Sequence, residues 1–363
     1  MNLQEQNILF FTRTMKLGGT ENVILQLCEI LQTKVNKIFV CSCGGVNVEV
    51  LNKMGIKHIQ IDDIENKSIF TTLRTIRTLL KIIKEEKITI IHTHHRMAAF
   101  YVSILGFYKK CVLVNTCHNT FMDKKILTKI AYKNVNLVAC GEMVKKNLID
   151  FYGLNNDQVT VIHNAVKPFN ESNAVVDPLI SRLHGEGKFV IGNIGRLSKQ
   201  KGMEYYLKAI PIVVRKYPNT MFLVIGSGED EEKLKKLVFE LKIQKYVIFM
   251  GYRSDIQNIM TQLDLVILSS LWEGLPLTPI EAFSVGKTIV ATAVDGTSEI
   301  VQDGINGYLV KPRDVSELSE KIERMIKNPE QVRKFEKNAK ERYKLQFSFQ
   351  KLAEKYIKYY EGL

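Results

Sequence analysis

Two glutamates at a spacing of eight positions are the residues most suited to binding a sugar or a ribose. Glu273 follows the apolar run that opens the segment Leu265–Val310, and Glu281 lies in the helix-like stretch after it. Carboxylates accept hydrogen bonds from neighbouring hydroxyls, which suits a sugar ring. Because Glu273 would lie in a loop and Glu281 one turn into the helix, we expect both carboxylates to line one cleft.

The turn between the glutamates predicts an anion site. Gly274 and Pro276 form a tight turn after the strand-like run Leu265–Leu268, and open α/β sheets bind ligands at the carboxyl ends of their strands. The helix that follows directs free N–H groups and a partial positive charge toward the same point, which suits phosphate. Phosphate beside two hydroxyl-binding carboxylates predicts a pocket for a nucleotide sugar.

Arg196 and Lys201 form a second candidate group, after the first strand of the second half and between Gly195 and Gly202. A planar guanidinium and a lysine point charge together suit a diphosphate. The alternative is a solvated loop with ordinary surface cations. The flanking glycines at a strand end favour binding, and Gly226 at another strand end is expected to line the same edge.

The first half of the chain carries looser signals. The backbone of Gly19 would approach a phosphate, although a bare turn explains the pair Gly18-Gly19 equally well. No spacing of Asp, Glu or Cys completes a zinc pattern around the histidines that follow two strands. We expect these histidines to bond a substrate hydroxyl or phosphate, His118 foremost. The four are His92, His94, His95 and His118.

Short apolar runs alternate with amphipathic stretches along the whole chain, which predicts an α/β fold with doubly wound parallel sheets. Two such domains are expected to face each other across a cleft, one at 1–168 and one at 169–345, with 346–363 as a helix that packs back on the first. The segment 167–188 holds two prolines and two glycines, so we expect it to be irregular and to link the domains.

The composition of the 363 residues, 45% hydrophobic and 25% charged, is that of a soluble globular protein. No apolar run reaches membrane-spanning length, and the N-terminus lacks the layout of a secretory signal. We therefore expect a cytoplasmic location, which includes the inner face of the cell membrane. The six cysteines all lie in the first 140 residues and are expected to be buried free thiols.

The net charge of +13 is uneven, because the first 170 residues carry 22 Lys and Arg against 13 Asp and Glu. A basic half indicates an anionic partner, either nucleic acid or a membrane surface. The segment Ile69–Lys84 has apolar residues at helical spacing with cations opposite, as an ordinary solvated helix also would. Near an anionic membrane each cation is worth ~1 kcal/mol. The cations of this acceptor or membrane surface are Arg74, Arg77, Lys81, Lys84, Lys109, Lys110, Lys124 and Lys125, followed by Lys129 and Lys133.

These stretches resemble the retaining glycosyltransferases of family four, which have the GT-B fold. The resemblance covers nearly the whole chain and is most specific at 269–291, where SSLWEGLPLTPIEAFSVGKTIVA contains the Glu-x7-Glu pair. GGTE at 18–21, VIHNAV at 161–166 and GRLSKQKG at 195–202 add to it. Two departures stand out: Asn164-Ala165 replaces the usual Asn-Gly, and DGTSE at 295–299 replaces the usual double glycine before the later glutamate.

By this resemblance, Arg196 and Lys201 would bind the donor diphosphate and stabilise it as the leaving group. Glu281 would hold the nucleotide ribose. Gly19 would approach the phosphates from the N-terminal domain. Because the cationic pair would replace a divalent ion, and because no Asp-x-Asp occurs in the chain, we expect a site without a metal or cofactor.

The resemblance also implies which residues meet the transferred sugar. Glu273 and the backbone of Gly274 and Leu275 would contact it in the donor, and His118 would contact it from the other domain. Retention of configuration needs either a nucleophile or a front-face attack assisted by the leaving phosphate. No carboxylate of the first domain stands out as a nucleophile, so front-face attack is expected, with charge stabilisation by the cations.

The expected enzyme is therefore a hexosyltransferase of polysaccharide biosynthesis, as in capsule or exopolysaccharide assembly. Its donor would be a nucleoside-diphosphate sugar, UDP-linked in the first instance, and its acceptor a saccharide or a polyprenyl-diphosphate-linked sugar. A sugar-nucleotide epimerase or a phosphorylase of the same fold is the alternative. A nucleic-acid-binding protein is suggested by charge alone, without stacking aromatics or a basic recognition helix, so no nucleic acid partner is expected.

Overall fold

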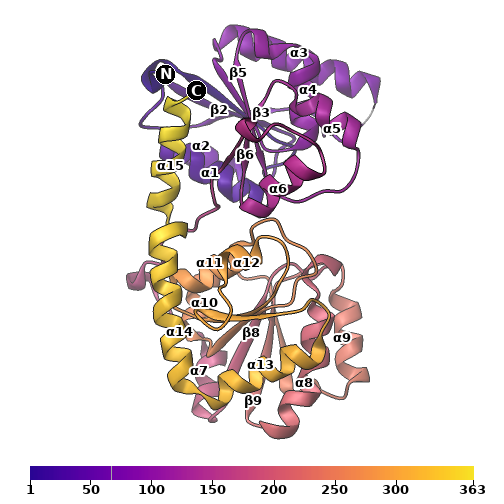
Figure 1. Ribbon diagram of the computed structural model, residues 1–363, viewed down its shortest axis with the longest axis vertical. Helices are drawn as coiled ribbons and strands as arrows, with labels where there is room; N and C mark the ends of the chain where they lie inside the picture. The colour runs from indigo at the N-terminus through magenta and orange to yellow at the C-terminus, as the bar shows by residue number, and fades with distance from the viewer. Residues whose placement is uncertain (67) are drawn as a thin grey trace. The chain divides into compact units, whose positions relative to one another are not determined.

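The computed structural model describes residues 1–66 and 68–363. The chain divides into two compact units, each with its own parallel sheet (Figure 1). Unit 1 comprises residues 1–164 together with 352–363, and unit 2 comprises residues 165–351.

Unit 1 is built on a parallel sheet in the order β3-β2-β1-β4-β5-β6-β7. The central strand β1 is buried along its whole length, as a sheet with helices on both faces requires. The strand order reverses between β1 and β4, and sheets of this kind bind ligands at such a switch point. The strands are β1 Asn7–Phe11, β2 Lys37–Ser42, β3 Lys57–Gln60, β4 Ile90–Thr93, β5 Val112–Cys117, β6 Asn136–Ala139 and β7 Val159–Val161.

Helices cover both faces of this sheet. Figure 1 shows α3 to α6 along one face and α1, α2 and the end of α15 along the other. This division follows from right-handed crossovers, because the chain moves outward from β1 in one direction and then, after β3, in the other. The helices are α1 Gly19–Leu31, α2 Val48–Lys53, α3 Ile69–Glu85, α4 Arg96–Ile104, α5 Lys125–Tyr132, α6 Glu142–Asp150 and α15 Phe349–Glu361.

Helix α3 forms over the segment with helical spacing, but three residues of its apolar row are largely exposed. Ile69 is 74% exposed, Leu73 45% and Leu80 50%. A different row of side chains is buried, and Thr72 Oγ1 next to it lies 3.3 Å from Tyr101 Oη of α4. The buried residues of α3 are Thr71, Thr75, Leu79 and Ile82.

Unit 2 repeats this architecture with a parallel sheet in the order β10-β9-β8-β11-β12-β13. The order reverses between β8 and β11, so the loops after these two strands flank the switch point. Strands are confirmed at each of the predicted apolar runs, and β13 was not predicted. The predicted runs are FVIGNIG from Phe189, Phe222–Ile225, Val247–Met250, Leu265–Leu268 and Thr288–Ala291. The strands are β8 Phe189–Ile194, β9 Thr220–Ile225, β10 Val247–Gly251, β11 Leu265–Leu268, β12 Ile289–Thr292 and β13 Gly307–Val310.

The prediction of an irregular segment over 167–188 was wrong in its second half, which forms α7. Asp177 caps this helix by accepting from the N–H groups of Leu179 and Ile180 at 3.0 and 3.2 Å. Asp followed by Pro178 at the first helical position is a helix-start signal. The helices of unit 2 are α7 Pro178–Gly185, α8 Met203–Lys216, α9 Glu231–Glu240, α10 Ile256–Gln262, α11 Leu277–Ser284, α12 Thr297–Ile300, α13 Val315–Lys327 and α14 Pro329–Arg342.

All six cysteines are free, and all except the partly exposed Cys43 are buried, which confirms the prediction of buried thiols for five of them. Across residues 1–66 and 68–363, no helix has both the length and the apolar character needed to cross a membrane.

Candidate active site

Two loops form the switch point of unit 2, and backbone and side-chain hydrogen bonds join them. The loop after β8 contains Gln200, whose carbonyl accepts from Leu271 N at 2.7 Å and whose amide donates to Trp272 O at 3.1 Å. Ser269 Oγ donates to the carbonyl of Lys201 at 3.0 Å. Because β8 and β11 are neighbours in the sheet, the two motifs predicted to bind the donor lie side by side.

An ion pair joins these two loops. Lys201 Nζ lies 2.6 Å from Glu273 Oε1, and the same oxygen accepts from Ser270 Oγ at 2.6 Å. The two charged side chains are only 18% and 6% exposed. A buried carboxylate needs such partners, since an unpaired charge away from water is costly. From the sequence, Lys201 and Glu273 were expected at one site, but the ion pair between them was not predicted.

The loop after β12 holds Glu273 from the other side. Glu273 N donates to Asp295 Oδ2 at 2.9 Å, and Gly296 N donates to Gly274 O at 2.9 Å. Asp295 has a φ of 35°, in the left-handed region that Asp tolerates better than most residues. Ser270 and Asp295 are the site residues that the sequence reasoning did not assign. An Asp-Gly pair at a strand end was the available signal.

Glu281 is the fifth residue of α11, one turn into the helix as predicted. Its side chain is partly buried, and burial raises the pKa of the carboxyl to about 7, opposed by the charge of Lys201. Within the described residues, no hydrogen bond reaches this carboxylate. It is therefore available to accept hydroxyls from a ligand.

Arg196 is exposed at the end of β8, and its guanidinium has no ion pair among the residues that the structure describes. Gly274 and Leu275 are buried in the turn before α11. Gly226 has a φ of +137°, and a Cβ on it would lie 2.0 Å from the carbonyl oxygen of Gly195. The glycine at this position therefore lets two strand-end loops touch, and its role toward a ligand stays a prediction.

Unit 1 has its own cavity, of about 240 Å³, at the carboxyl ends of β4 and β5. The guanidinium of Arg96 in its wall is neutralised by Asp123, with N–O distances of 2.7 and 3.2 Å. Most of the remaining lining is neutral, polar or aromatic, which suits a saccharide more than a strongly charged group. Six of the lining residues are His94, His118, Asn119, Tyr132, Asn147 and Tyr152.

The site residues predicted in the first half lie at different depths of unit 1. His118 lines the cavity, whereas His92 is fully buried beneath it. Gly19 is the first residue of α1, at the same edge of the sheet, and its neighbour Thr20 lines the cavity. Gly19 and His118 therefore belong to one edge of unit 1, as expected.

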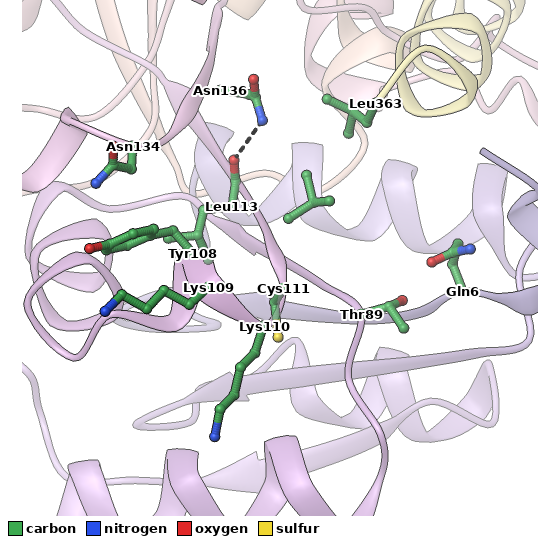
Figure 2. Close-up of a pocket in the computed structure, with 11 residues that line it drawn as sticks. Gln6, Thr89, Tyr108, Lys109, Lys110, Cys111, Leu113, Asn134, Asn136 and Leu363 are labelled. Atoms are coloured by element: carbon green, nitrogen blue, oxygen red, sulfur yellow. Dashed lines mark hydrogen bonds between the residues drawn. The ribbon is translucent and has the colours of Figure 1, made fainter.

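The predicted basic residues lie on separate parts of unit 1. Arg74, Arg77, Lys81 and Lys84 lie on α3, while Lys124 and Lys125 begin α5. Lys109 and Lys110 line a separate hollow of about 520 Å³ at the opposite edge of the sheet, where β5 and β6 begin. Figure 2 shows both lysines across this hollow from Gln6.

Two Rossmann-like units of seven and six parallel strands, with loops converging at the carboxyl edges of their sheets, define a GT-B protein. The chain matches the family model "Glycosyl transferases group 1" over residues 180–342 and "Glycosyltransferase Family 4" over residues 17–168. It belongs to the family-four-like glycosyltransferases and acts on nucleotide-sugar donors.

Named relatives agree with this assignment. The chain is 26% identical to the UDP-Gal:alpha-D-GlcNAc-diphosphoundecaprenol alpha-1,3-galactosyltransferase of Escherichia coli, over 82% of both chains. It is 30% identical to the poly(glycerol-phosphate) alpha-glucosyltransferase of Bacillus subtilis, over 61% of this chain and 33% of that one. HepE of Anabaena, solved with UDP, superimposes with a TM-score of 0.84 at 21% identity, covering 99% of this chain and 100% of that one.

Proposed function

We propose that this enzyme transfers a hexose from a UDP-sugar, with retention of configuration, to a saccharide or to a sugar on a polyprenyl diphosphate. The observation that carries the proposal is the set of groups around the unit 2 switch point. The pair Lys201–Glu273, together with the Arg196 guanidinium and the Glu281 carboxylate, which have no side-chain partner in residues 1–66 and 68–363, offers the charges that a nucleoside-diphosphate sugar needs.

Each part of the donor has a matching group in unit 2. The Glu281 carboxylate would accept from the ribose hydroxyls. Arg196 and the N–H groups at the start of α11 would bind the diphosphate. Glu273 would accept from hydroxyls of the transferred sugar, as the resemblance implies. The UDP-bound structure of HepE and the UDP-galactose enzyme of Escherichia coli support the choice of UDP.

The reaction we propose is a front-face substitution. The bond from the anomeric carbon to the diphosphate oxygen breaks, and the acceptor oxygen attacks from the same face. The acceptor hydroxyl gives its proton to the departing phosphate oxygen. One oxygen of Glu273 is already bonded to Lys201 and Ser270. The proposed route uses no protein nucleophile, and the positive charge of Arg196 stabilises the leaving group.

The acceptor proposal rests on the cavity of unit 1 and on the surface next to it. The neutral polar and aromatic lining of the cavity suits a saccharide. A lipid-linked acceptor adds a second requirement, because the enzyme must reach a membrane surface. The relative from Escherichia coli acts on a diphosphoundecaprenol-linked sugar.

Helices α3 and α5 provide a surface suited to that contact. On α3, Phe70 is 80% exposed, and on α5, Ile126 is 74% exposed. Cations follow along both helices, so apolar side chains could enter the headgroup region while Lys and Arg meet anionic lipid. We call these residues the α3–α5 surface. They are Ile69, Phe70, Leu73, Arg74, Arg77, Leu80, Lys81 and Lys84 of α3, with Lys124, Lys125, Ile126, Leu127, Lys129 and Ile130 of α5.

A thermal-shift screen with UDP, GDP, ADP and CMP tests the donor, because a ligand that binds the folded state raises its melting temperature. We expect UDP to stabilise the wild type and not Glu281→Ala. Transfer is then assayed with UDP-sugars on polyprenyl-diphosphate-linked and free saccharides, and the product linkage is read by NMR. An inverted linkage would contradict retention. Donor turnover that needs no acceptor, or that needs only inorganic phosphate, would favour the epimerase or the phosphorylase.

A further inference from the structure

Three histidines form a stack at the cavity of unit 1, in which His92 and His94 are buried and His118 is partly exposed. The rings of His92 and His94 are stacked with centroids 4.4 Å apart, and those of His94 and His118 with centroids 5.3 Å apart. The stack follows from the sheet, because alternate residues on the parallel neighbours β4 and β5, continued one residue past the end of each strand, share one face. Burial lowers the pKa of His118 to about 4 and that of His92 to about 3, so these imidazoles are neutral near pH 7.

The lower end of the stack is held by the C-terminal helix. His92 Nδ1 is hydrogen-bonded to Tyr360 Oη, and His92 Nε2 lies 2.8 Å from Thr116 Oγ1. Both nitrogens of His92 are therefore occupied. Tyr356 Oη, also from α15, lies 3.2 Å from the same Thr116 hydroxyl. His92 is fixed in position, and its ring gives His94 a fixed plane on which to stack.

The upper end is a hydrogen bond between two imidazoles, with His94 Nδ1 3.0 Å from His118 Nε2. A neutral imidazole has one N–H and one bare nitrogen. If His94 donates from Nδ1, His118 must carry its own proton on Nδ1. If His118 donates from Nε2, its Nδ1 is bare and His94 carries its proton on Nε2. The tautomers of His94 and His118 are thus coupled.

The surroundings of His94 decide between these two states. His94 Nε2 is buried without a hydrogen-bond partner in the described part of the chain. An unpaired buried N–H is rarer in proteins than an unsatisfied buried acceptor. The state with the bare nitrogen at this position is therefore favoured, and it places the proton of His94 on Nδ1.

We propose that His94 is a positioning residue that locks His118 in the Nδ1–H tautomer. His118 Nδ1 has no hydrogen bond to the residues that the structure describes, and His118 lines the cavity. The nitrogen left for a substrate is then a hydrogen-bond donor. His118 binds a lone pair of a sugar oxygen and does not take a proton, which agrees with a front-face reaction that needs no protein base.

The test is a long-range ¹H–¹⁵N correlation spectrum of the full chain labelled with ¹⁵N-histidine. The signals of His118 are assigned by their loss in His118→Asn. We expect a proton on Nδ1 and a bare Nε2 in the free protein. A proton on Nε2 of His118 in the wild type would overturn the proposal without any further variant.

Two substitutions of similar size separate positioning from packing. His94→Asn keeps an N–H that can donate to His118 Nε2 and should keep the Nδ1–H pattern. His94→Leu cannot donate, so the His118 proton should move to Nε2 or divide between both nitrogens. An unchanged pattern in His94→Leu contradicts the proposal. His184→Asn, in unit 2, is the control and should leave the His118 signals as they are.

The kinetic consequence rests on the proposed function. If His118 donates to the transferred sugar, His94→Leu should lower kcat roughly tenfold with little change in the KM for the donor, and His94→Asn should restore most of it. A wild type with the expected tautomer but no transferase activity would contradict the proposed function and leave the tautomer assignment intact. A normal kcat in His94→Leu, despite a shifted tautomer, would contradict the donor role of His118.

Discussion

Lys201 Nζ and Glu273 Oε1 lie 2.6 Å apart and join the loops that follow β8 and β11. The resemblance gives these residues separate tasks, one at the diphosphate and one at the sugar. Because of this pairing, the Glu273 carboxylate already neutralises the positive charge of Lys201 before a donor binds. We therefore expect the exposed Arg196, together with the start of α11, to supply much of the positive charge that meets the diphosphate.

Breaking this pair should affect stability as well as transfer. Lys201→Met leaves the Glu273 carboxylate buried without its cation, and we expect it to lower the free energy of unfolding by about 3 kcal/mol. Glu273→Gln should cost less, because the amide can still bond Ser270 and Lys201. Urea unfolding of both variants and of the double variant measures the coupling. Strictly additive effects would mean that the pair contributes nothing to the fold.

The raised pKa of Glu281 predicts a pH dependence of nucleotide binding. A carboxyl with a pKa of about 7 is mostly protonated at pH 6 and mostly ionised at pH 8. Only the ionised form accepts from both ribose hydroxyls, so binding should release a proton and UDP affinity should rise up to about tenfold across this range. Calorimetry in two buffers of different ionisation enthalpy measures the proton.

Glu281→Gln is the control for this prediction, because it removes the titrating carboxyl and keeps one acceptor. The remaining pH dependence should be that of the terminal phosphate of UDP, which titrates near pH 6. If the variant and the wild type release the same number of protons on binding UDP, Glu281 does not titrate with the ligand.

The α3–α5 surface predicts binding to vesicles that contain anionic lipid. Phe70→Ser combined with Ile126→Ser should reduce sedimentation with such vesicles, and high salt should weaken what remains because it screens the cations. Phe239→Ser is the matched control, since Phe239 is 66% exposed on α9 of unit 2. Equal losses in the control would point to general instability, and binding to neutral vesicles alone would contradict the role of the cations.

Two glycine substitutions compare a close contact with an open position. Gly226→Ala would place a Cβ 2.0 Å from Gly195 O, whereas Gly304, with a φ of +71°, has no atom within 4 Å of its Cβ position. We expect Gly304→Ala to cost about 1 kcal/mol for its left-handed backbone and Gly226→Ala to cost more. Gly226→Ala should also weaken UDP binding, because it displaces the loop that carries Arg196. Equal melting temperatures would contradict this reading of Gly226.

Much of the fold could be predicted from the sequence, because most of the buried parallel strands appear as short apolar runs. The runs at Leu265–Leu268 and Phe189–Ile194 became β11 and β8 as predicted. The buried face of α3 could not be predicted. Hydrophobic periodicity indicates which side chains avoid water in general, whereas the structure buries Thr71 and Thr75 of α3 and leaves Ile69 largely exposed.

By itself, the sequence determined the two-sheet architecture, the family and the group of motifs that meet at the switch point of unit 2, because each of these depends on local patterns and on motifs that remain contiguous along the chain. Only the tertiary structure decided which of those residues are partners. Lys201 and Glu273 are 72 positions apart, and His94 and His118 are 24 apart. Such pairs form where neighbouring strands end at one edge of a sheet, and the order of strands in the sheet decides which loops meet there.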